Sequence, residues 1–232
     1  MTGAPSLIIF GSHETAALAK FYFQNDSPYR VKAFTVDDEY VGESKVEGLP
    51  VLPFSEVTNS CLPSEHAIHV AVSYRGLNRF REEKYEQCRK AGYQLATYVS
   101  SKSFFWATDL EVGSNCFILE NQTIQPGVRI GNNVMIWSGN HLGHGTQIKD
   151  HAYISSHVCI SGNCVIGERV FMGVNSATKD FVTINSDSFV GMGALVTRDM
   201  PPGSVSLGAQ SSLNEANSDI AKRVREKYFS QE

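Results

Sequence analysis

Residues 124–148 read IQPGVRIGNNVMIWSGNHLGHGTQI, and an aliphatic side chain returns at every sixth position. The spacing continues unbroken in both directions, and an apolar residue fills every position except Thr178. The full set is Val112, Ile118, Ile124, Ile130, Ile136, Leu142, Ile148, Ile154, Ile160, Ile166, Met172, Thr178, Ile184, Val190 and Val196. Neither a helix, with a period of about 3.6, nor a lone strand, with a period of about 2, requires this register, whereas a coil of three short β faces does. The second half of the chain is therefore predicted to be a parallel β-helix.

Glycines and cysteines follow the same repeat. Glycine directly follows the repeat residue at Gly113, Gly131, Gly143, Gly167, Gly173 and Gly191, where we expect corners with an unusual φ. The five cysteines are an odd number without a CxxC pair, so we expect neither a disulfide framework nor a tetrathiolate zinc site. We expect all of them to be small buried apolar residues: Cys61, Cys88, Cys116, Cys159 and Cys164.

The first hundred residues have a different pattern, in which strands alternate with helices. We expect strands at 7–10, 30–36, 67–73 and 93–99, and helices at 13–24, 56–61 and 77–91. This alternation predicts a parallel sheet covered on both faces, that is, a Rossmann-like α/β unit. Residues 48–53, GLPVLP, are predicted to form a surface loop because prolines punctuate them.

The alternation stops at residues 100–107, just before the six-residue register begins. We therefore divide the chain into an α/β domain at 1–102, a β-helix at 103–212 and a C-terminal helix at 213–232. In that last segment Ala216, Ile220, Val224 and Tyr228 recur four apart. This spacing predicts a short amphipathic helix that packs on its own or on a neighbouring subunit.

Composition excludes several classes of protein. A length of 232 residues with 42% apolar content suits two modest globular domains. The net charge of −4 argues against nucleic acid as a partner, and we expect the one basic cluster, at 222–227, on a solvated helix face. The longest early apolar run, Leu7 to Phe10, is too short for a signal peptide or a membrane span. We expect a cytoplasmic protein without a membrane partner.

The aliphatic–glycine pairs of the repeat, such as Ile130-Gly131, Leu142-Gly143 and Ile166-Gly167, resemble those of the bacterial hexapeptide-repeat acyltransferases. The resemblance implies a left-handed coil. The spacing itself gives no hand, and the general crossover rule would favour the opposite one.

The whole chain resembles one branch of that family, the sugar acyltransferases with an N-terminal nucleotide-sugar domain. The bacillosamine N-acetyltransferase and the sialic acid O-acetyltransferases are of this type. Four segments carry the resemblance: LIIFGSH at 7–13, FTVDD at 34–38, 70–79 with the charged helix that follows it, and 140–174. It implies a homotrimer that transfers an acetyl group from acetyl-CoA to the amino group of a nucleotide-linked deoxy sugar. The acyl-CoA would lie between neighbouring coils, and the N-terminal domain would hold the sugar nucleotide.

Four histidines crowd one part of the coil: His141, His144, His151 and His157. Acyl transfer from a thioester needs a proton acceptor, and histidine is the natural one at neutral pH. The resemblance implies His144 as general base and His151 as a second active-site histidine, with His141 as a further candidate. The family often has an acidic residue directly after its base, whereas this chain has Gly145, so another group must orient the imidazole. An alternative is that the substrate amine loses its proton unaided and the enzyme only positions the reactants.

The resemblance also implies contacts to the ligands. The turn Gly11-Ser12-His13 opens a helix whose free N–H groups and dipole suit a pyrophosphate, and Asp37 and Asp38 end a strand where such sheets bind ligands. Close contacts to acyl-CoA are expected from Gly162, Gly173, Val174, Gly191 and Gly193. The family's usual Gly-Val-Pro-Ala-Lys ending is replaced here by LGAQS at 207–211, which leaves the nucleotide end of CoA without an assigned contact.

Three alternatives stay open. Some β-helix trimers with this repeat bind zinc across a subunit interface, but the histidine spacings differ here and we expect no metal. Nothing in the sequence separates an amino acceptor from a hydroxyl, or acetyl from formyl-like or hydroxybutanoyl donors. A β-helix scaffold that binds partners without turnover is the non-enzymatic alternative.

Overall fold

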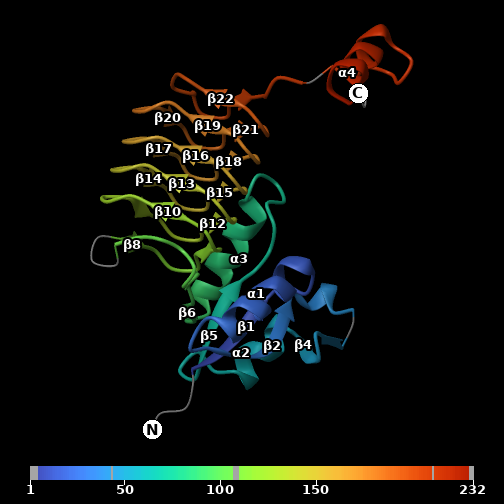
Figure 1. Ribbon diagram of the computed structural model, residues 1–232. Coiled ribbons are helices and arrows are strands. Elements are labelled where there is room, and N and C mark those ends of the chain that lie inside the picture. The colour runs from blue at the N-terminus through green and yellow to red at the C-terminus, as the bar shows by residue number, and fades with distance from the viewer. Residues whose placement is uncertain (1–4, 43, 107–109, 211, 230–232) are drawn as a thin grey trace.

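The computed structural model describes residues 5–42, 44–106, 110–210 and 212–229. Figure 1 shows an α/β unit next to the N-terminus, a stacked coil that continues from it, and helix α4 (Asp219–Phe229) beyond the far end of the coil. Residue 107, the last of the predicted junction, lies outside the described residues.

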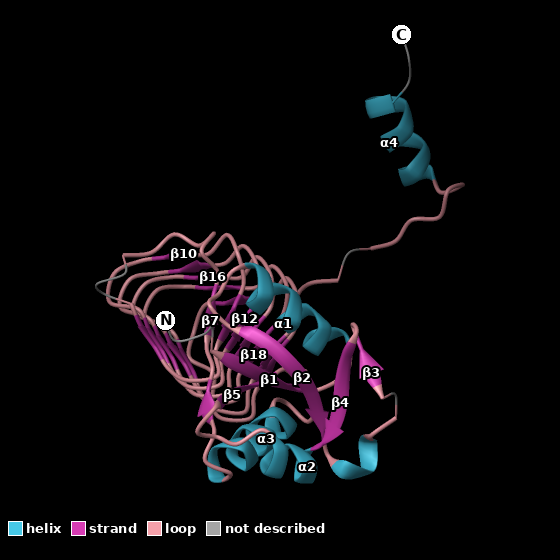
Figure 2. Cartoon of the chain, turned by 90° about the horizontal axis from the view of Figure 1, so that it is seen from below, coloured by secondary structure: helices cyan, strands magenta, loops and turns pink. Residues whose placement is uncertain are grey.

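The N-terminal unit is built on a six-stranded sheet of order β3-β4-β2-β1-β5-β6. Its strands are β1 (Ser6–Phe10), β2 (Arg30–Val36), β3 (Lys45–Val46), β4 (Leu49–Pro53), β5 (His66–Val70) and β6 (Gln94–Leu95). All neighbouring strands run parallel except β3 and β4. Helix α1 (Glu14–Asn25) lies on one face, and α2 (Phe54–Ser60) and α3 (Arg79–Lys90) lie on the other (Figure 2). The predicted alternation of strands and helices is therefore present.

Two local predictions were wrong. Residues 48–53, predicted as a surface loop, contribute strand β4, in which Val51 is buried and pairs with Phe34. The prolines are tolerated because only the two-residue β3 lies outside β4, so little ladder is lost there. The predicted strand at 93–99 is split into β6 and β7 (Tyr98–Val99) because the chain changes partners: Ala96 N–H donates to Ile68, whereas Tyr98 N–H donates to Cys116. Coil pairing thus begins at Tyr98, and the division of the chain near residue 103 stays a prediction.

The coil stacks three parallel sheets, each named here after one of its strands. The β13 sheet contains β10 (Thr123–Ile124), β13 (His141–Leu142), β16 (Cys159–Ile160), β19 (Ala177–Thr178) and β22 (Leu195–Val196). The β14 sheet contains β8 (Glu111–Val112), β11 (Arg129–Ile130), β14 (Gln147–Ile148), β17 (Val165–Ile166) and β20 (Thr183–Ile184). The β15 sheet contains β7, β9 (Phe117–Ile118), β12 (Met135–Ile136), β15 (Tyr153–Ile154), β18 (Phe171–Met172), β21 (Phe189–Val190) and β23 (Val205–Ser206). Seen nearly along the coil, the sheets form the sides of a prism (Figure 2).

The repeat residues fill the inside of this prism. Leu142 pairs with Ile160 and Ile136 with Ile154, one rung of eighteen residues apart. All of the repeat residues are buried except the partly buried Val112 in the first rung, and even Thr178 is only 6% exposed. The predicted parallel β-helix is confirmed.

The residues with a positive φ at the corners of the prism are not the ones that the sequence analysis predicted. A positive φ recurs every six residues from Asn115 to Gly193, three positions after each repeat residue and not directly after it. Three edges result. We call them the His144 edge (Gly127, Gly145, Asn163, Phe181), the His151 edge (Asn115, Asn133, His151, Arg169, Asp187) and the His157 edge (Asn121, Gly139, His157, Asn175, Gly193). Asparagine and glycine predominate because they adopt the left-handed region at low cost.

The glycines that directly follow the repeat residues serve another purpose. A Cβ on Gly143 would lie 2.5 Å from the carbonyl carbon of Ser161, and one on Gly173 would lie 2.5 Å from the backbone nitrogen of Met192. These positions lack a side chain because the next rung passes too close.

The cysteines only partly match their prediction. Cys88, Cys116 and Cys164 are buried, but Cys61 is half-buried and Cys159 is exposed. Cys159 occupies the outward position of β16, because side chains alternate between the two faces of a strand and its neighbour Ile160 points inward.

Candidate functional site

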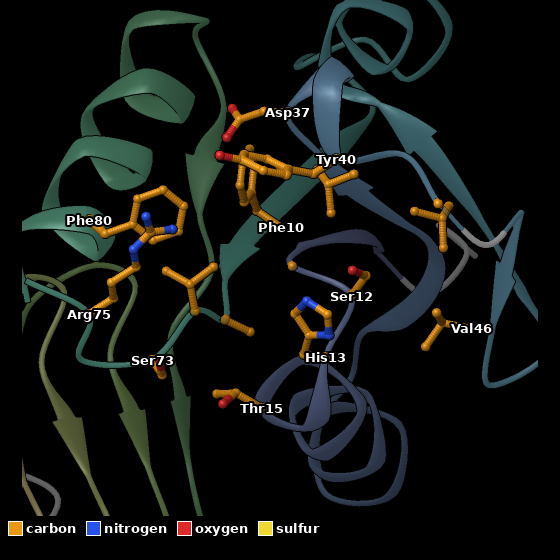
Figure 3. Close-up of a pocket in the computed structure, with 16 residues that line it drawn as sticks. Phe10, Ser12, His13, Thr15, Asp37, Tyr40, Val46, Ser73, Arg75 and Phe80 are labelled. Atoms are coloured by element: carbon orange, nitrogen blue, oxygen red, sulfur yellow. The ribbon is translucent and has the colours of Figure 1, made fainter.

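A cavity of about 570 Å³ opens at the carboxyl ends of β1, β2 and β5 (Figure 3). Of the predicted nucleotide-sugar residues it contains Gly11, Ser12, His13 and Asp37. The carboxylate of Asp38 instead accepts a hydrogen bond of 3.1 Å from Ser55 N–H at the start of α2, a contact that lowers its pKa. The Asp38 carboxylate therefore binds the N-terminus of α2 and is not among the residues that line the cavity.

Gly11, which lines this cavity, lets the chain turn from β1 into α1. Its φ is +125°, and its N–H donates to the Thr35 carbonyl at 2.7 Å. A Cβ on this residue would lie 2.7 Å from the Ala71 carbonyl oxygen. Only glycine fits such a close approach of two strand ends. The turn brings the first N–H groups of α1 to the wall that carries Ser12 and His13.

Asp37 is held by a cation from α3. Its carboxylate lies 2.8 Å from Lys84 Nζ, and both side chains are largely buried. Burial by itself would lower the pKa of Lys84, but hydrogen bonds to Asp37 and Glu83 outweigh it and raise that pKa. The charge of Asp37 is thereby largely neutralised, while its remaining oxygen lone pairs stay able to accept from a ligand.

Arg75 faces the α1 turn from the opposite wall (Figure 3). Its guanidinium lies over the Phe80 ring, 5.3 Å from the centroid, and is exposed. Within the described part of the chain it makes no ion pair. The sequence analysis did not single this residue out, although a cation in the loop that follows a strand was a usable signal. The cavity therefore combines apolar walls, a free cation and a helix N-terminus, which together suit a phosphorylated ligand.

His144 lies on the exterior of the coil, between β13 and β14. Gln125 Oε1, which can only accept, lies 3.2 Å from His144 Nδ1 and 2.9 Å from its backbone nitrogen. This assigns the ring proton to Nδ1, and Asn163 Nδ2 lies 3.3 Å from Nε2. Gln125 therefore orients the imidazole in place of the missing acidic residue. In this tautomer Nε2 carries the lone pair that a general base requires, and a substrate proton would have to displace the Asn163 amide that donates to it at 3.3 Å.

The structure does not bring the other two predicted histidines beside His144. His141 lies on the outer face of the β13 sheet, in register with Cys159. His151 lies on another edge, where α3 covers it: its carbonyl accepts from Arg81 at 2.8 Å and its Nε2 is 3.6 Å from Glu82. Burial lowers the pKa of His151. The catalytic roles of His141 and His151 stay predictions.

His151 belongs to a polar seam that joins the N-terminal unit to the coil. Asn115 Oδ1 accepts a hydrogen bond from Val70 N–H of β5, and its Nδ2 donates one to Asn133 Oδ1. Asn133 Nδ2 in turn lies 2.9 Å from His151 Nδ1. Further along, Arg169 contacts Glu82 of α3 at 3.2 Å. The corner residues of one edge thus hold α3 against the prism.

The predicted acyl-CoA positions divide between two edges. Gly162 lies on the His144 edge, whereas Gly173, Val174, Gly191 and Gly193 follow strands of the β15 sheet and lie on the His157 edge. A Cβ on Gly193 would have no heavy atom within 4 Å, and Val174 is exposed. Within one chain the β13 sheet separates the two groups.

The described residues lack two further features. They contain no cluster of three or more His, Cys, Asp or Glu side chains placed to hold a metal. No helix in the ranges that the structure covers has the length and apolar character needed to cross a membrane.

Comparisons with known proteins point to one family for the coil. Residues 127–162 match the bacterial transferase hexapeptide (six repeats) model. An acyl-[acyl-carrier-protein]–UDP-N-acetylglucosamine O-acyltransferase from Paracoccus denitrificans is 29% identical over 117 residues, which are 47% of this chain and 45% of that protein. The chain thus spans less than half the length of this curated relative.

Two solved structures resemble nearly the whole chain. The acetyltransferase domain of PglB from Neisseria gonorrhoeae, in complex with acetyl coenzyme A, has a TM-score of 0.78 at 22% identity and covers 89% of this chain and 97% of its own. PerB from Caulobacter crescentus, in complex with CoA and GDP-perosamine, has a TM-score of 0.78 at 21% identity and covers 90% and 97%. At this identity the likeness establishes the fold.

Proposed function

We propose that the protein is an acyl-CoA-dependent N-acetyltransferase of nucleotide-linked amino sugars, and the match of residues 127–162 to the bacterial transferase hexapeptide model supports this proposal. The N-terminal unit is then a Rossmann-like nucleotide-sugar domain, and the coil has the left hand of that family. The observation that carries the proposal is the pairing of a phosphate-suited cavity with an exposed, oriented histidine in one chain.

The cavity supports a sugar nucleotide in the following way. Its apolar side chains, among them Phe10, Val36 and Tyr40, suit a base and ribose. Asp37 offers acceptors to their N–H or O–H groups. The diphosphate would lie between Arg75 and the N-terminal N–H groups of α1, where both the cation and the helix dipole favour negative charge.

His144 supports the chemical step. The amine nitrogen of the sugar attacks the thioester carbonyl carbon, the carbon–sulfur bond breaks, and CoA leaves as a thiolate. The proton that the amine loses passes to Nε2 of His144 and from there to the thiolate, so the products are an amide and free CoA. Gln125 keeps the ring in the tautomer that this step requires.

We propose that the active site is completed by a second copy in a trimer. The cavity adjoins α3, which packs on the His151 edge, whereas His144 lies on a different edge of the same prism. A neighbouring copy would bring its cavity and its His157 edge, with Gly173, Val174, Gly191 and Gly193, to the His144 edge. Acetyl-CoA would lie in that groove beside Gly162.

The proposal is tested by following thiol release from acetyl-CoA with a panel of UDP- and GDP-linked amino sugars and their hydroxyl analogues. Turnover that requires the amino group supports N-acetylation, and turnover on the hydroxyl analogues supports the O-acetyltransferase alternative. Absence of turnover with acetyl, formyl and hydroxybutanoyl donors on every acceptor would reject an enzyme and favour a scaffold. The identity of the accepted sugar would indicate which glycan the product enters.

Sharing of the site between copies has its own test. At subsaturating sugar nucleotide, Arg75→Ala and His144→Ala are each expected to be strongly impaired, but co-expression forms mixed assemblies that contain some intact sites if the two residues come from different copies. Partial recovery of activity is expected. Co-expressed His144→Ala and Gln125→Ala serve as the control, because both changes damage the same copy's site and no recovery is expected.

A further inference from the structure

The loop between β5 and α3 carries two neighbouring side chains that face different parts of the molecule. Arg75 lines the cavity (Figure 3). The Tyr74 ring packs on the coil instead, where its centroid lies 5.1 Å from that of Tyr153 and 5.0 Å from that of Phe171, edge-on to both. One short segment of chain therefore joins the cation of the cavity to the outer face of the coil.

The rings that Tyr74 contacts belong to a column on the outer face of the β15 sheet. Tyr153 pairs with Phe171, and Phe171 with Phe189, each one rung apart. Neighbouring rings in this column are stacked, with their centroids 5.1 Å apart and their planes at 13° and 7°. A ring that meets such a stack with its edge is attracted to it. Tyr74 thus rests on side chains that the parallel ladder of the coil holds in place.

The backbone of the same loop is strained. Three consecutive residues have a positive φ, namely Gly76 at +63°, Leu77 at +52° and Asn78 at +67°. Leucine enters the left-handed region at a cost, because its Cβ then crowds the following carbonyl oxygen. A conformation of this kind persists only where the surrounding contacts determine it, and it collects at segments that bind ligands.

The coil also holds the loop on the other side of Arg75. The Asn78 side chain is buried, and its Nδ2 donates to the Arg169 carbonyl at 3.2 Å. Within the loop, the Asn78 N–H donates to the Tyr74 carbonyl at 3.1 Å and closes the turn. Arg75 therefore lies between two residues that are both fixed to the coil.

We propose that Tyr74 is a positioning residue for the sugar nucleotide. By packing on the coil it holds residues 73–78 in their strained conformation and keeps Arg75 turned into the cavity, where the guanidinium meets the diphosphate. Among the described residues Arg75 has no ion pair of its own, so its place depends on the backbone that carries it. The identity of the ligand rests on the proposed function, whereas the hold on the loop requires no ligand.

The effect on the ligand is tested by calorimetric titration of UDP and GDP. Tyr74→Ala is expected to weaken the binding of whichever nucleotide the cavity accepts by about three- to tenfold, because Arg75 is no longer preorganised. Tyr74→Phe keeps the ring and should bind within about twofold of the original protein. In a protein that already carries Arg75→Ala, adding Tyr74→Ala should cost less than about twofold, since no cation is left to position.

Phe21→Ala is the matched control for these titrations. It removes an aromatic ring of α1 that is 60% exposed and that contacts Tyr22, the next residue in the chain. The nucleotide affinity of this variant should equal that of the original protein. A loss as large as that in Tyr74→Ala would mean that any exposed ring of the N-terminal unit has this effect, and would reject a particular role for Tyr74.

The hold on the loop is tested without a ligand by hydrogen exchange, read by mass spectrometry on peptides that cover residues 74–82. The N–H groups of Asn78 and Phe80 donate to the carbonyls of Tyr74 and Arg75. These groups should exchange at least about tenfold faster in Tyr74→Ala, because the loop opens more often, and at about the original rate in Tyr74→Phe.

Several outcomes would overturn the positioning role. Unchanged exchange in Tyr74→Ala would show that the ring does not hold the loop. An affinity loss that is equally large in Tyr74→Phe, or undiminished in the Arg75→Ala protein, would make Tyr74 a ligand contact. A lower oligomeric mass of Tyr74→Ala in sedimentation would make it a subunit contact.

Failure of the proposed function gives a different pattern. If the exchange and the nucleotide affinities change as expected but no acceptor is acylated, the proposed function is wrong and the positioning role stands. If the original protein binds neither UDP nor GDP, both are rejected.

Discussion

The imidazole of His144 occupies the space in which a side chain on Gly162 would stand, because a Cβ there would lie 2.5 Å from the His144 Cε1 atom. The ring thus rests on the backbone of the next rung while Gln125 holds it from below. Glycine at this position is a condition for the orientation of the histidine.

Gly162→Ala is therefore expected to displace the imidazole and lower the acyl-transfer rate about 10- to 100-fold. The melting temperature should change little, because a ring at the end of a flexible side chain can move away. Steady-state kinetics and thermal unfolding check both statements. In a protein that already carries His144→Ala, adding Gly162→Ala should lower the acyl-transfer rate hardly further. If the rate fell by the same factor in both backgrounds, the steric explanation would be wrong.

His144→Ala is expected to lower the rate by about 10²- to 10⁴-fold, since it removes the proton acceptor. The measurement is kcat with acetyl-CoA and the accepted amino sugar. His66→Asn serves as control, because it changes a histidine at the start of β5 in the N-terminal sheet, away from the edges of the coil. A loss below about threefold in His144→Ala would favour a mechanism in which the enzyme only positions the reactants.

Arg75→Ala is expected to weaken the binding of UDP or GDP, whichever the cavity accepts, by about tenfold or more, because a charge-assisted contact to phosphate is lost. Titration calorimetry measures this directly. The guanidinium is exposed and lies over the Phe80 ring without an ion pair among the described residues, so stability should change little. Arg30→Ala, which removes an exposed arginine at the start of β2, should leave nucleotide binding intact. Equal effects of the two changes would mean that general charge, and not the cavity, attracts the nucleotide.

His69 should make the protein sensitive to acid. Burial lowers its pKa from 6.5 to about 4, and its ring packs against Phe23 and Phe117 with Nε2 unpartnered. The unfolded chain therefore binds this proton more readily, so stability is full above about pH 6.5 and falls by about 3 kcal/mol as the pH drops toward 4. Chemical denaturation between pH 7 and pH 4.5 measures the slope.

His69→Phe should flatten that slope, although it also removes the 2.8 Å bond from Nδ1 to the Ala96 carbonyl. Some slope should persist, because burial also lowers the pKa of His151 and acts in the same direction. His66→Phe is the matched comparison on the same strand, since that histidine is not fully buried. Identical slopes in the original protein and in His69→Phe would refute the assignment.

Gly143→Ala should destabilise the coil by about 1–3 kcal/mol, because the new Cβ would meet backbone atoms of the next rung that cannot move aside. Gly193→Asn is the contrasting change. No atom lies within 4 Å of its Cβ position, and asparagine accepts its φ of +67°, as Asn121 and Asn175 do on the same edge. Thermal unfolding should separate the two variants, and a Gly193→Asn protein that is as unstable as Gly143→Ala would contradict the distinction.

The sequence by itself determined the prism. Whether a side chain points inward depends only on its position in the six-residue repeat, which is visible in the sequence. The repeat from Val112 to Val196 therefore predicts a rung of eighteen residues, three sides for each rung, and parallel stacking of the rungs. The same register places residues eighteen apart on one edge, so His144 and His151 fall on different edges by their spacing alone. It also contained most of the left-handed corners, visible as the asparagine or glycine that stands three positions after nine of the repeat residues.

Only the tertiary structure decided what covers each edge. Lys84 pairs with Asp37, Ser55 engages Asp38, and Arg81 reaches the His151 carbonyl from an element 70 residues away in the chain. Local periodicity fixes which way a side chain points, because that depends on backbone geometry alone. It does not fix which distant helix packs there, because that depends on the summed shape and charge of two surfaces that meet only after both have folded.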